Sequence, residues 1–184
     1  ILNGTKFWIT NGGEAGFFLV FANGDFSKGY KGISGFMVER DFPGFSVGKK
    51  ENKLGMRAAE TASVVFEACY VPDENRLGSL GEGFLQAMQI LDGGRISIAA
   101  LSVGIAQGAY EAAVRYSKER QQFGRPISEF QAIQFKLADM ATQIEAARLL
   151  TLKAARMKDA GQRSDLEAGM AKLFASEAAM TIAL

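Results

Sequence analysis

The stretch that decides the fold is ASVVFEACYVPDENRLGSLGEGFLQAMQIL, residues 62–91, in which one apolar pattern gives way to another. Its first part alternates with a period of two, which is typical of a half-buried strand. The alternating residues are Val64, Phe66 and Ala68 on one side and Val65 and Glu67 on the other. From Gly81 onward the apolar residues follow a helical pattern. Strands followed by helices predict an α+β fold.

Residues 1–80 predict a central β domain, a small antiparallel barrel or sandwich. Short apolar or alternating runs recur and are separated by turn residues such as Asn11-Gly12-Gly13 and Pro43-Gly44. The expected strands are 6–10, 17–22, 33–38, 45–48 and 62–71.

Residues 81–184 predict an antiparallel helical bundle, a truncated four-helix domain. Helical patterns cover 84–91 and 95–122, and Gly124 with Pro126 is expected to end the second one. Two capping boxes predict further helix starts, at Ser128-Glu129-Phe130-Gln131 and Ser164-Asp165-Leu166-Glu167. No end signal precedes Leu184. We therefore expect this domain to be incomplete and both ends of the chain to be cut.

The composition narrows the function classes. Apolar residues make up 48% and charged residues 22%, and the formal net charge is +1, so nothing favours nucleic acid as a partner. The chain has no histidine, which removes serine–histidine triads and the usual zinc ligands. Cys69 is the only cysteine, so we expect no disulfide and no metal site. The apolar run 96–110 is too short for a membrane span.

The stretch GTKFWITNGG, residues 4–13, is expected to present Lys6, Trp8 and Thr10 on one side of a strand. A strand tryptophan is most often part of a core. The alternative is a platform for a flat ligand, with the indole as the stacking surface and the Thr10 hydroxyl as a hydrogen-bonding group. The residues alone leave both interpretations open.

Two stretches of the helical part are candidates for binding polar ligands. Asp92 and Arg95 stand three residues apart around two glycines that each cost about 1 kcal/mol in a helix. They form either a helical ion pair or a pair aimed at a polar ligand chain. Arg120 either complements the end of a helix or meets a phosphate in a bidentate manner, with Phe123 as an apolar floor.

These stretches, in this order, resemble the acyl-CoA dehydrogenase family, and its short-chain, butyryl-CoA-like branch is most similar. The resemblance runs along essentially the whole chain, as the central β domain plus part of the C-terminal helical domain. It is carried by NGTKFWITNGG (3–13), KLGMRAAETASVVFEACYVP (53–72), GEGFLQAMQILDGGR (81–95), SKERQQFGRPISEFQAIQFKLADMA (117–141) and EAARLL (145–150).

The resemblance implies an FAD site and a thioester site. In the family, Trp8 and Thr10 correspond to residues that pack on the flavin ring and hydrogen-bond near its N5. The implied cofactor-binding residues are Trp8, Ile9, Thr10, Arg120, Gln122, Phe123 and Gln131. The implied substrate-binding residues are Asp92, Gly93, Gly94 and Arg95. In the family, the residues from the helical domain act across a dimer interface.

The implied chemistry is α,β-dehydrogenation of a short-chain acyl-CoA, with hydride transfer to flavin in fatty acid β-oxidation. Gly94 stands where other branches carry a glutamate base, so we expect no catalytic residue in this chain and a base beyond Leu184. The implied partners are an electron-transfer flavoprotein and further copies, as a dimer of dimers. We expect a bacterial cytoplasmic location in preference to the mitochondrial matrix.

Two other functions fit the same residues. An acyl-CoA oxidase-like flavoenzyme shares the architecture, and fold alone does not decide between the two. A non-catalytic oligomerisation or binding module would explain the expected lack of a base within the chain.

Overall fold

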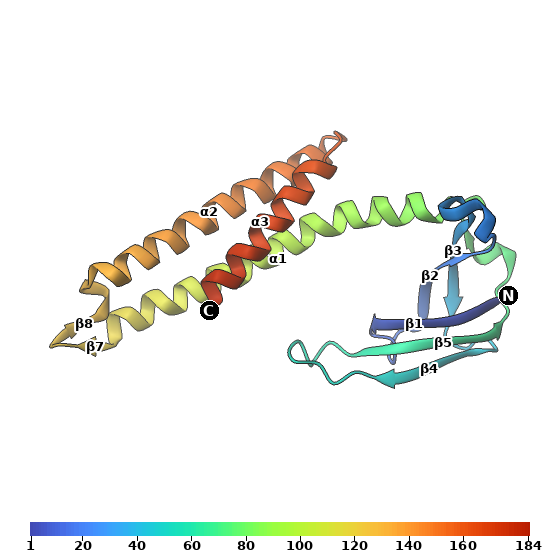
Figure 1. Cartoon of the computed structure of the whole chain (residues 1–184), viewed down its shortest axis with the longest axis horizontal. Coiled ribbons are helices and arrows are strands. Elements are labelled where there is room, and N and C mark those ends of the chain that lie inside the picture. Colours follow the sequence, from blue (N-terminus) through green and yellow to red (C-terminus); the bar gives the residue numbers. More distant parts are fainter. The chain divides into compact units, whose positions relative to one another are not determined.

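A computed structural model describes all residues from Ile1 to Leu184, and the chain divides into two compact units. The β unit is Ile1–Met88 and the helical unit is Gln89–Leu184. The helix α1 (Gly83–Glu119) begins in the first and continues through the second (Figure 1). The predicted α+β order, strands first and helices afterwards, is confirmed.

The β unit is built from two three-stranded antiparallel sheets. One has the order β1-β5-β4, with β1 at Leu2–Thr10, β5 at Thr61–Cys69 and β4 at Phe45–Lys50. The other has the order β2-β3-β6, with β2 at Phe17–Asn23, β3 at Ile33–Glu39 and β6 at Arg76–Leu77. The sheets do not close on each other, so the sandwich is the correct one of the two predicted forms.

The inner faces of both sheets supply one core. Phe18, Val20 and Val38 come from the second sheet, while Val64 and Phe66 come from β5. These side chains alternate along their strands with more exposed ones, as the period-two pattern predicts. The core also contains Cys69, where burial raises the pKa of the thiol and keeps it protonated.

A β-bulge interrupts β1 and corrects the predicted face of the opening stretch. Lys6 pairs with Val64 and Ile9 pairs with Ala62, so β1 carries one residue more than β5 between these two pairs. Lys6 and Ile9 therefore share a face, and Thr10 lies on the other one. The expectation that Lys6, Trp8 and Thr10 line one side was wrong, because strict alternation does not survive an extra residue.

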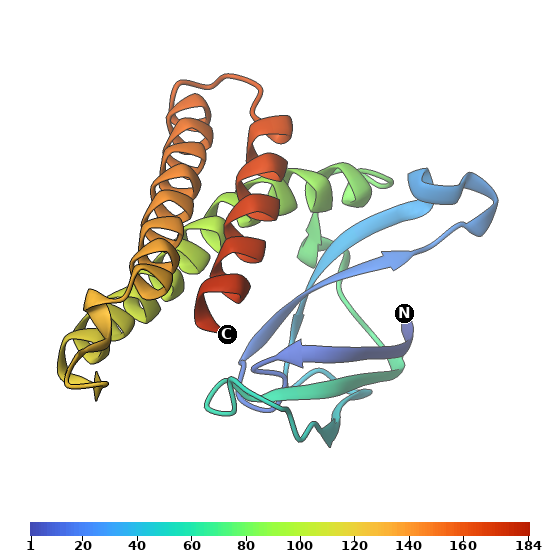
Figure 2. The ribbon, with the colours of Figure 1, turned by 60° about the vertical axis from the view of Figure 1, so that its left-hand side comes forward.

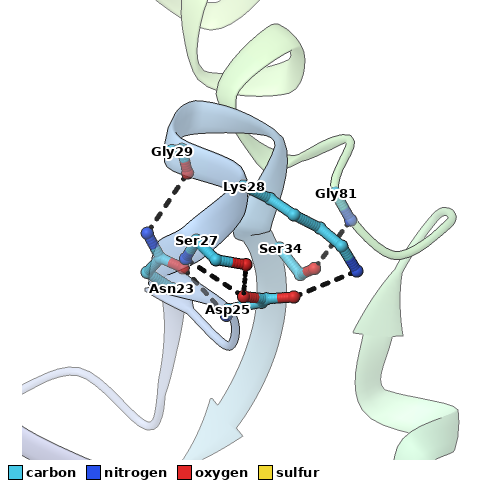
Figure 3. Close-up of polar contacts among 7 residues, drawn as sticks. All are labelled: Asn23, Asp25, Ser27, Lys28, Gly29, Ser34 and Gly81. Atoms are coloured by element: carbon cyan, nitrogen blue, oxygen red, sulfur yellow. Dashed lines mark hydrogen bonds and ion pairs between the residues drawn. The ribbon is translucent and has the colours of Figure 1, made fainter.

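The connection from β2 to β3 contains the 3₁₀ helix η1 (Phe26–Gly32), capped by Asp25. The Asp25 carboxylate accepts hydrogen bonds from the backbone and the hydroxyl of Ser27 and pairs with Lys28 at 3.1 Å (Figure 3). These contacts, with the Ser27 hydrogen bond the largest, lower the pKa of Asp25. Nearby, the buried Ser34 hydroxyl accepts from the Gly81 amide at 2.9 Å, which ties the approach to α1 onto β3.

The helical unit consists of the remainder of α1, α2 (Gln131–Asp159) and α3 (Asp165–Ala183). Figure 2 shows α2 and α3 running side by side from the turn that joins them. Their contact surfaces are lined mainly by alanines, whose small side chains allow close helix packing. The buried alanines of the helical unit, with Ala99 and Ala106 in α1 and the others in α2 and α3, are Ala99, Ala106, Ala147, Ala154, Ala168, Ala171, Ala175, Ala178 and Ala179.

Several predicted helix limits differ from the structure. α1 runs without a break through the Asp92–Arg95 stretch, where two separate helical segments were expected, and it ends at Glu119 instead of Gln122. α2 starts at Gln131 without a side-chain cap, so the capping box at Ser128 was wrong. α3 does begin after Ser164, but that side chain makes no capping hydrogen bond.

One 18-residue window of α1 has a mean hydropathy of 1.2 and few charges, so α1 is long and apolar enough to cross a membrane by length and composition. The prediction from residues 96–110 did not foresee a helix of 37 residues. Ala99 and Ala106 of this helix pack against α2 and α3. A helix that contributes to a core meets the same criterion.

Candidate functional site

Trp8 is the exposed centre of the candidate site in the β unit. Its side chain is 75% exposed, and it lies in the bulge with a φ of 55°. This left-handed conformation costs roughly 1–2 kcal/mol for a residue other than glycine. The Phe7 ring lies 6.0 Å from the indole and is also exposed. The core interpretation of Trp8 is therefore wrong, and the bulge presents the indole to solvent.

Ile9 and Thr10, the two residues after Trp8, have different surroundings. Ile9 is half-buried and packs against the core of the β unit. Thr10 pairs with Thr61 at the end of β1, and its exposed hydroxyl has no hydrogen-bond partner in the chain. The backbone therefore holds Thr10 in place while its hydroxyl stays free to bind a ligand.

Phe123 is the exposed centre of a second candidate site, at one end of the helical unit. β7 (Gln121–Gln122) pairs with β8 (Arg125–Pro126), so Phe123 and Gly124 form a two-residue hairpin. Their φ angles are 54° and 79°, as a type I′ turn requires. Phe123 is 92% exposed. The sequence had predicted helix here, because its glutamines and Phe123 gave no sign of a hairpin.

Phe130 supports this hairpin from below. The Phe123 ring meets the Phe130 ring edge-on, with centroids 6.2 Å apart, and the Arg125 guanidinium lies 4.3 Å from the centre of the Phe130 ring. The Arg120 carbonyl accepts the Ile127 amide at 2.8 Å and closes the base of the loop. The strained turn is thus held by contacts on both of its sides.

The structure brings three predicted cofactor-binding residues, Arg120, Gln122 and Phe123, into one short segment around this hairpin. The Arg120 side chain is exposed and makes no ion pair. Its place just after the end of α1 leaves the guanidinium available to an anion. Gln131, the fourth predicted residue, is the exposed first residue of α2.

Asp92 and Arg95 form the ion pair that their spacing predicted. Arg95 Nη1 donates to Asp92 Oδ1 at 2.6 Å, and both side chains are about two-fifths exposed. A Cβ added at Gly93 would collide with the Lys158 ammonium group, whereas nothing surrounds that position at Gly94. The pair is therefore preformed, and its outer edge stays open to a polar ligand.

Each unit by itself offers groups that fit part of a flat cofactor that carries phosphates, as the resemblance implied. The β unit offers an exposed indole and a free hydroxyl within three residues, Trp8 to Thr10. The helical unit offers an exposed phenyl ring and an unpaired guanidinium within four residues, Arg120 to Phe123. Aromatic stacking and arginine–phosphate contacts are the interactions that such a cofactor needs.

Sequence reasoning missed the backbone strain that Trp8 and Phe123 share. Bulky side chains with a positive φ are genuine outliers, and such strain gathers at ligand sites. No sequence signal marks it, since asparagine and glycine are the residues associated with this geometry. Phe7, beside the indole, was also not singled out.

Family models match both parts of the chain. Residues 1–69 match the acyl-CoA dehydrogenase middle domain, and residues 81–184 match the acyl-CoA dehydrogenase C-terminal domain. The short-chain specific acyl-CoA dehydrogenase of rat mitochondria is 54% identical over 182 residues, which cover 99% of this chain and 44% of that protein. The chain thus spans less than half the length of such relatives.

Several solved structures are also similar to the chain over nearly its whole length. Butyryl-CoA dehydrogenase from Megasphaera elsdenii has a TM-score of 0.95 at 52% identity, covering 98% of this chain and 47% of that one. A chain from a study of the electron transferring flavoprotein of Acidaminococcus fermentans has a TM-score of 0.96 at 56% identity. The match covers 99% of this chain and 48% of that one. The structure of PigA with FAD and proline has a TM-score of 0.91 at 33% identity, and the match covers 97% of this chain and 47% of that one. By these matches to both of its parts, the chain belongs to the acyl-CoA dehydrogenase family.

Proposed function

We propose that this chain is the flavin- and thioester-binding part of an FAD-dependent dehydrogenase that acts on a short-chain acyl-CoA. One observation carries the proposal. Trp8 and Phe123 are both exposed aromatic residues with a positive φ, and both stand where the family resemblance expects cofactor contacts. A purely structural role would favour glycine or asparagine at such positions.

FAD, when bound, supplies the acceptor for the hydride that leaves the β-carbon of the thioester. Trp8 stacks on the flavin ring and excludes water from one side of it. The Thr10 hydroxyl donates a hydrogen bond toward the ring, and Ile9 anchors both neighbours to the core of the β unit. The bulge determines where the indole points, because Trp8 is the residue at positive φ within it.

The helical unit holds the cofactor's polar end in this proposal. Arg120 pairs with the pyrophosphate, where a planar guanidinium binds two oxygens at once. Gln122 and Gln131 donate amide hydrogens beside it, and Phe123 covers the adjacent apolar surface. These residues serve the cofactor of a second copy, so the working form is a homo-oligomer, a dimer of dimers.

The Asp92–Arg95 pair holds the polar chain of the thioester. The preformed ion pair presents both a carboxylate oxygen and guanidinium hydrogens to amide and hydroxyl groups of such a chain. Gly93 and Gly94 have no side chains that would cover the backbone between Asp92 and Arg95. We assign no catalytic base among residues 1–184, because Gly94 offers no carboxylate at the helix position used in other branches of the family.

The electron acceptor in this proposal is an electron-transfer flavoprotein. The proposal places the protein in the bacterial cytoplasm in preference to the mitochondrial matrix; relatives from both bacteria and mitochondria match the chain. An acyl-CoA oxidase would use the same fold, so reactivity with oxygen separates the two enzymes.

The test is a titration of the purified chain with FAD, followed by Trp fluorescence and visible absorbance. Trp8 is the only tryptophan, so its emission reports on stacking directly. We expect quenching that saturates, and weaker binding in Thr10→Val and Arg120→Gln. Phe26→Ala, which removes another exposed aromatic ring of the β unit, is the matched control.

Loss of FAD affinity in the control alone, or no quenching at any FAD concentration, would contradict the proposal. Anaerobic addition of butyryl-CoA to the flavin-loaded protein then tests the chemistry. Bleaching supports dehydrogenation, and rapid reoxidation in air favours the oxidase.

A further inference from the structure

The turn that follows Thr10 is held from two sides by charged side chains. Gly13 lies in the connection from β1 to β2, where the chain passes from one sheet to the other. Its amide donates to Glu60 Oε2 at 3.0 Å, and its carbonyl accepts from Arg40 Nη1 at 2.6 Å. Glu60 and Arg40, here called the Gly13 clamp, thus bind one residue through a carboxylate and a guanidinium.

The two residues of the clamp come from different sheets. Glu60 directly precedes β5, and Arg40 directly follows β3. Both are half-buried, and neither forms an ion pair. Arg40 also donates to the Ala15 carbonyl at 3.4 Å. Half-buried charges without a counterion need such hydrogen bonds to offset the loss of water, so both charges are committed to this turn.

The clamp acts on the end of β1, where Thr10 lies. Thr10 pairs with Thr61, and the next residue, Asn11, turns the chain with a φ of 57°. The Asn11 amide donates to the Glu60 carbonyl at 2.8 Å, so Glu60 binds this turn through its backbone and through its side chain. No other side chain forms a hydrogen bond with the backbone of residues 11–16. The clamp therefore holds the chain directly beyond Thr10.

The carboxylate of Glu60 explains why residue 13 is a glycine. A Cβ at Gly13 would lie 2.8 Å from Glu60 Oε1, so a larger residue would displace the carboxylate. Gly13 has no positive φ, so the backbone itself does not require a glycine there. At Gly16, later in the same connection, an added Cβ would meet nothing within 4 Å.

We propose that Glu60 and Arg40 are positioning residues that fix the Thr10 hydroxyl for its contact with the flavin ring. This inference rests on the proposed function, in which Thr10 donates a hydrogen bond toward that ring. A hydroxyl that must reach one edge of a rigid ring binds better when its backbone is already held in place. The clamp itself does not touch the ligand and acts through Thr10.

A clamp that serves only stability makes a different prediction. Its removal would loosen the β unit and weaken FAD binding to the same extent whether or not residue 10 carries a hydroxyl. A clamp that positions Thr10 loses its effect on binding once the hydroxyl is removed, because the two residues then act on one interaction.

The test is a double-mutant cycle on the full chain, with FAD affinity measured by tryptophan fluorescence. We expect Glu60→Ala to weaken FAD binding about fivefold in the parent chain and less than twofold in Thr10→Val. Glu60→Gln should keep most of the affinity, because its amide oxygen can still accept from Gly13. Gly13→Ala, which displaces the carboxylate, should resemble Glu60→Ala.

Two substitutions serve as matched controls. Gly16→Ala adds a methyl group to the same connection without a collision. Glu67→Ala removes an exposed glutamate of β5 whose side chain makes no ion pair. Both should bind FAD as the parent chain does.

Amide hydrogen exchange in the FAD-free chain gives a second measurement. We expect Glu60→Ala and Arg40→Ala to speed exchange at the Asn11 amide about tenfold while the Val64 amide in the core stays protected. Arg40→Lys, which keeps a donor, should lie closer to the parent chain.

Equal effects of Glu60→Ala in the parent chain and in Thr10→Val, or unchanged exchange at Asn11, would overturn the inference. Faster exchange at Val64 as well would overturn it too, because the clamp would then serve only stability. FAD binding that Thr10→Val weakens and Glu60→Ala does not would refute the inference alone. No FAD binding by the parent chain, with Asn11 still responding to Glu60→Ala, would refute the proposed function and leave the clamp on the turn confirmed.

Discussion

Trp8 and Phe123 have nearly the same backbone geometry but very different support. Trp8 lies in a bulge whose partner strand β5 is buried on both sides of it, at Ala62 and Val64. Phe123 lies at the tip of a hairpin that has only two pairs of residues. In the β unit, strand pairing and a buried core thus hold Trp8 in its strained conformation. In the helical unit, only one turn and the contact with the Phe130 ring hold Phe123.

The difference shows two ways in which a protein can keep an aromatic side chain exposed. In the bulge, the strain is part of the pairing of β1 with β5, because the extra residue lets Lys6 and Ile9 share a face although they stand three positions apart. In the hairpin, the strain is local, and another residue can replace Phe123 without moving the helices.

The largest effect is expected from deletion of Phe7 and Trp8 together. Ile9 then follows Lys6 directly, so the two can no longer share a face of β1, and the β unit should lose about 3 kcal/mol of unfolding free energy. Guanidinium unfolding followed by circular dichroism measures this loss. Trp8→Gly keeps the bulge and should remain within about 1 kcal/mol of the parent. Equal losses in both variants would show that the register does not depend on the bulge.

Removing each ring separately should weaken FAD binding without unfolding either unit. Trp8→Ala and Phe123→Ala are each expected to lower the affinity for FAD by about three- to tenfold, the range for lost aromatic stacking. Equilibrium dialysis with FAD measures both variants. Phe135→Ala, which removes an exposed ring of α2, is the control. An unchanged affinity in both ring variants would refute the shared role of the two residues.

Phe123→Asn should stabilise the helical unit while FAD binding weakens. The substitution creates Asn-Gly, the preferred pair for a type I′ turn, and removes the strain of a bulky residue at positive φ. We expect a gain of about 1 kcal/mol, measured as a shift of the denaturant midpoint at constant slope. Destabilisation would mean that the contact with Phe130 outweighs the strain.

The smallest effect concerns the carboxylates at the two exposed turns. Hydrogen bonds lower the pKa of Asp25, mainly from Ser27, and that of Asp165, mainly from Arg163. A lowered pKa in the folded state stabilises above the usual value of 3.8, and this contribution is lost as the pH falls below it. In Asp25→Asn and in Asp165→Asn, the free energy of unfolding should therefore decrease slightly less as the pH is lowered. A larger decrease in either variant would contradict a lowered pKa of that carboxylate.

Much of the fold could be predicted from the chain because the signals are local. The alternation around Val64 and Phe66 predicted β5, and the helical patterns over 84–91 and 95–122 predicted most of α1. Asp92 and Arg95 form the ion pair expected from their spacing. The family resemblance indicated candidate residues in both units, and their roles in binding stay predictions.

The errors concern features that depend on distant residues. The bulge at Trp8 exists because β1 pairs with β5, far away in the chain, and no neighbour of Trp8 signals it. The hairpin at Phe123 replaced a predicted helix end because its two short strands pair and Phe130 packs below it. The Ser128 capping box failed because that residue belongs to a 3₁₀ turn.

The sequence by itself determined the order of strands and helices, because side-chain periodicity is a property of local segments. Its resemblance to the family indicated candidate residues for a flavin site. Only the tertiary structure decided that the indole of Trp8 faces solvent, that α1 runs unbroken through two glycines, and that Lys158 lies over Gly93. Strand register and helix packing decide these features, because each depends on free energies summed over contacts between segments that are distant in sequence.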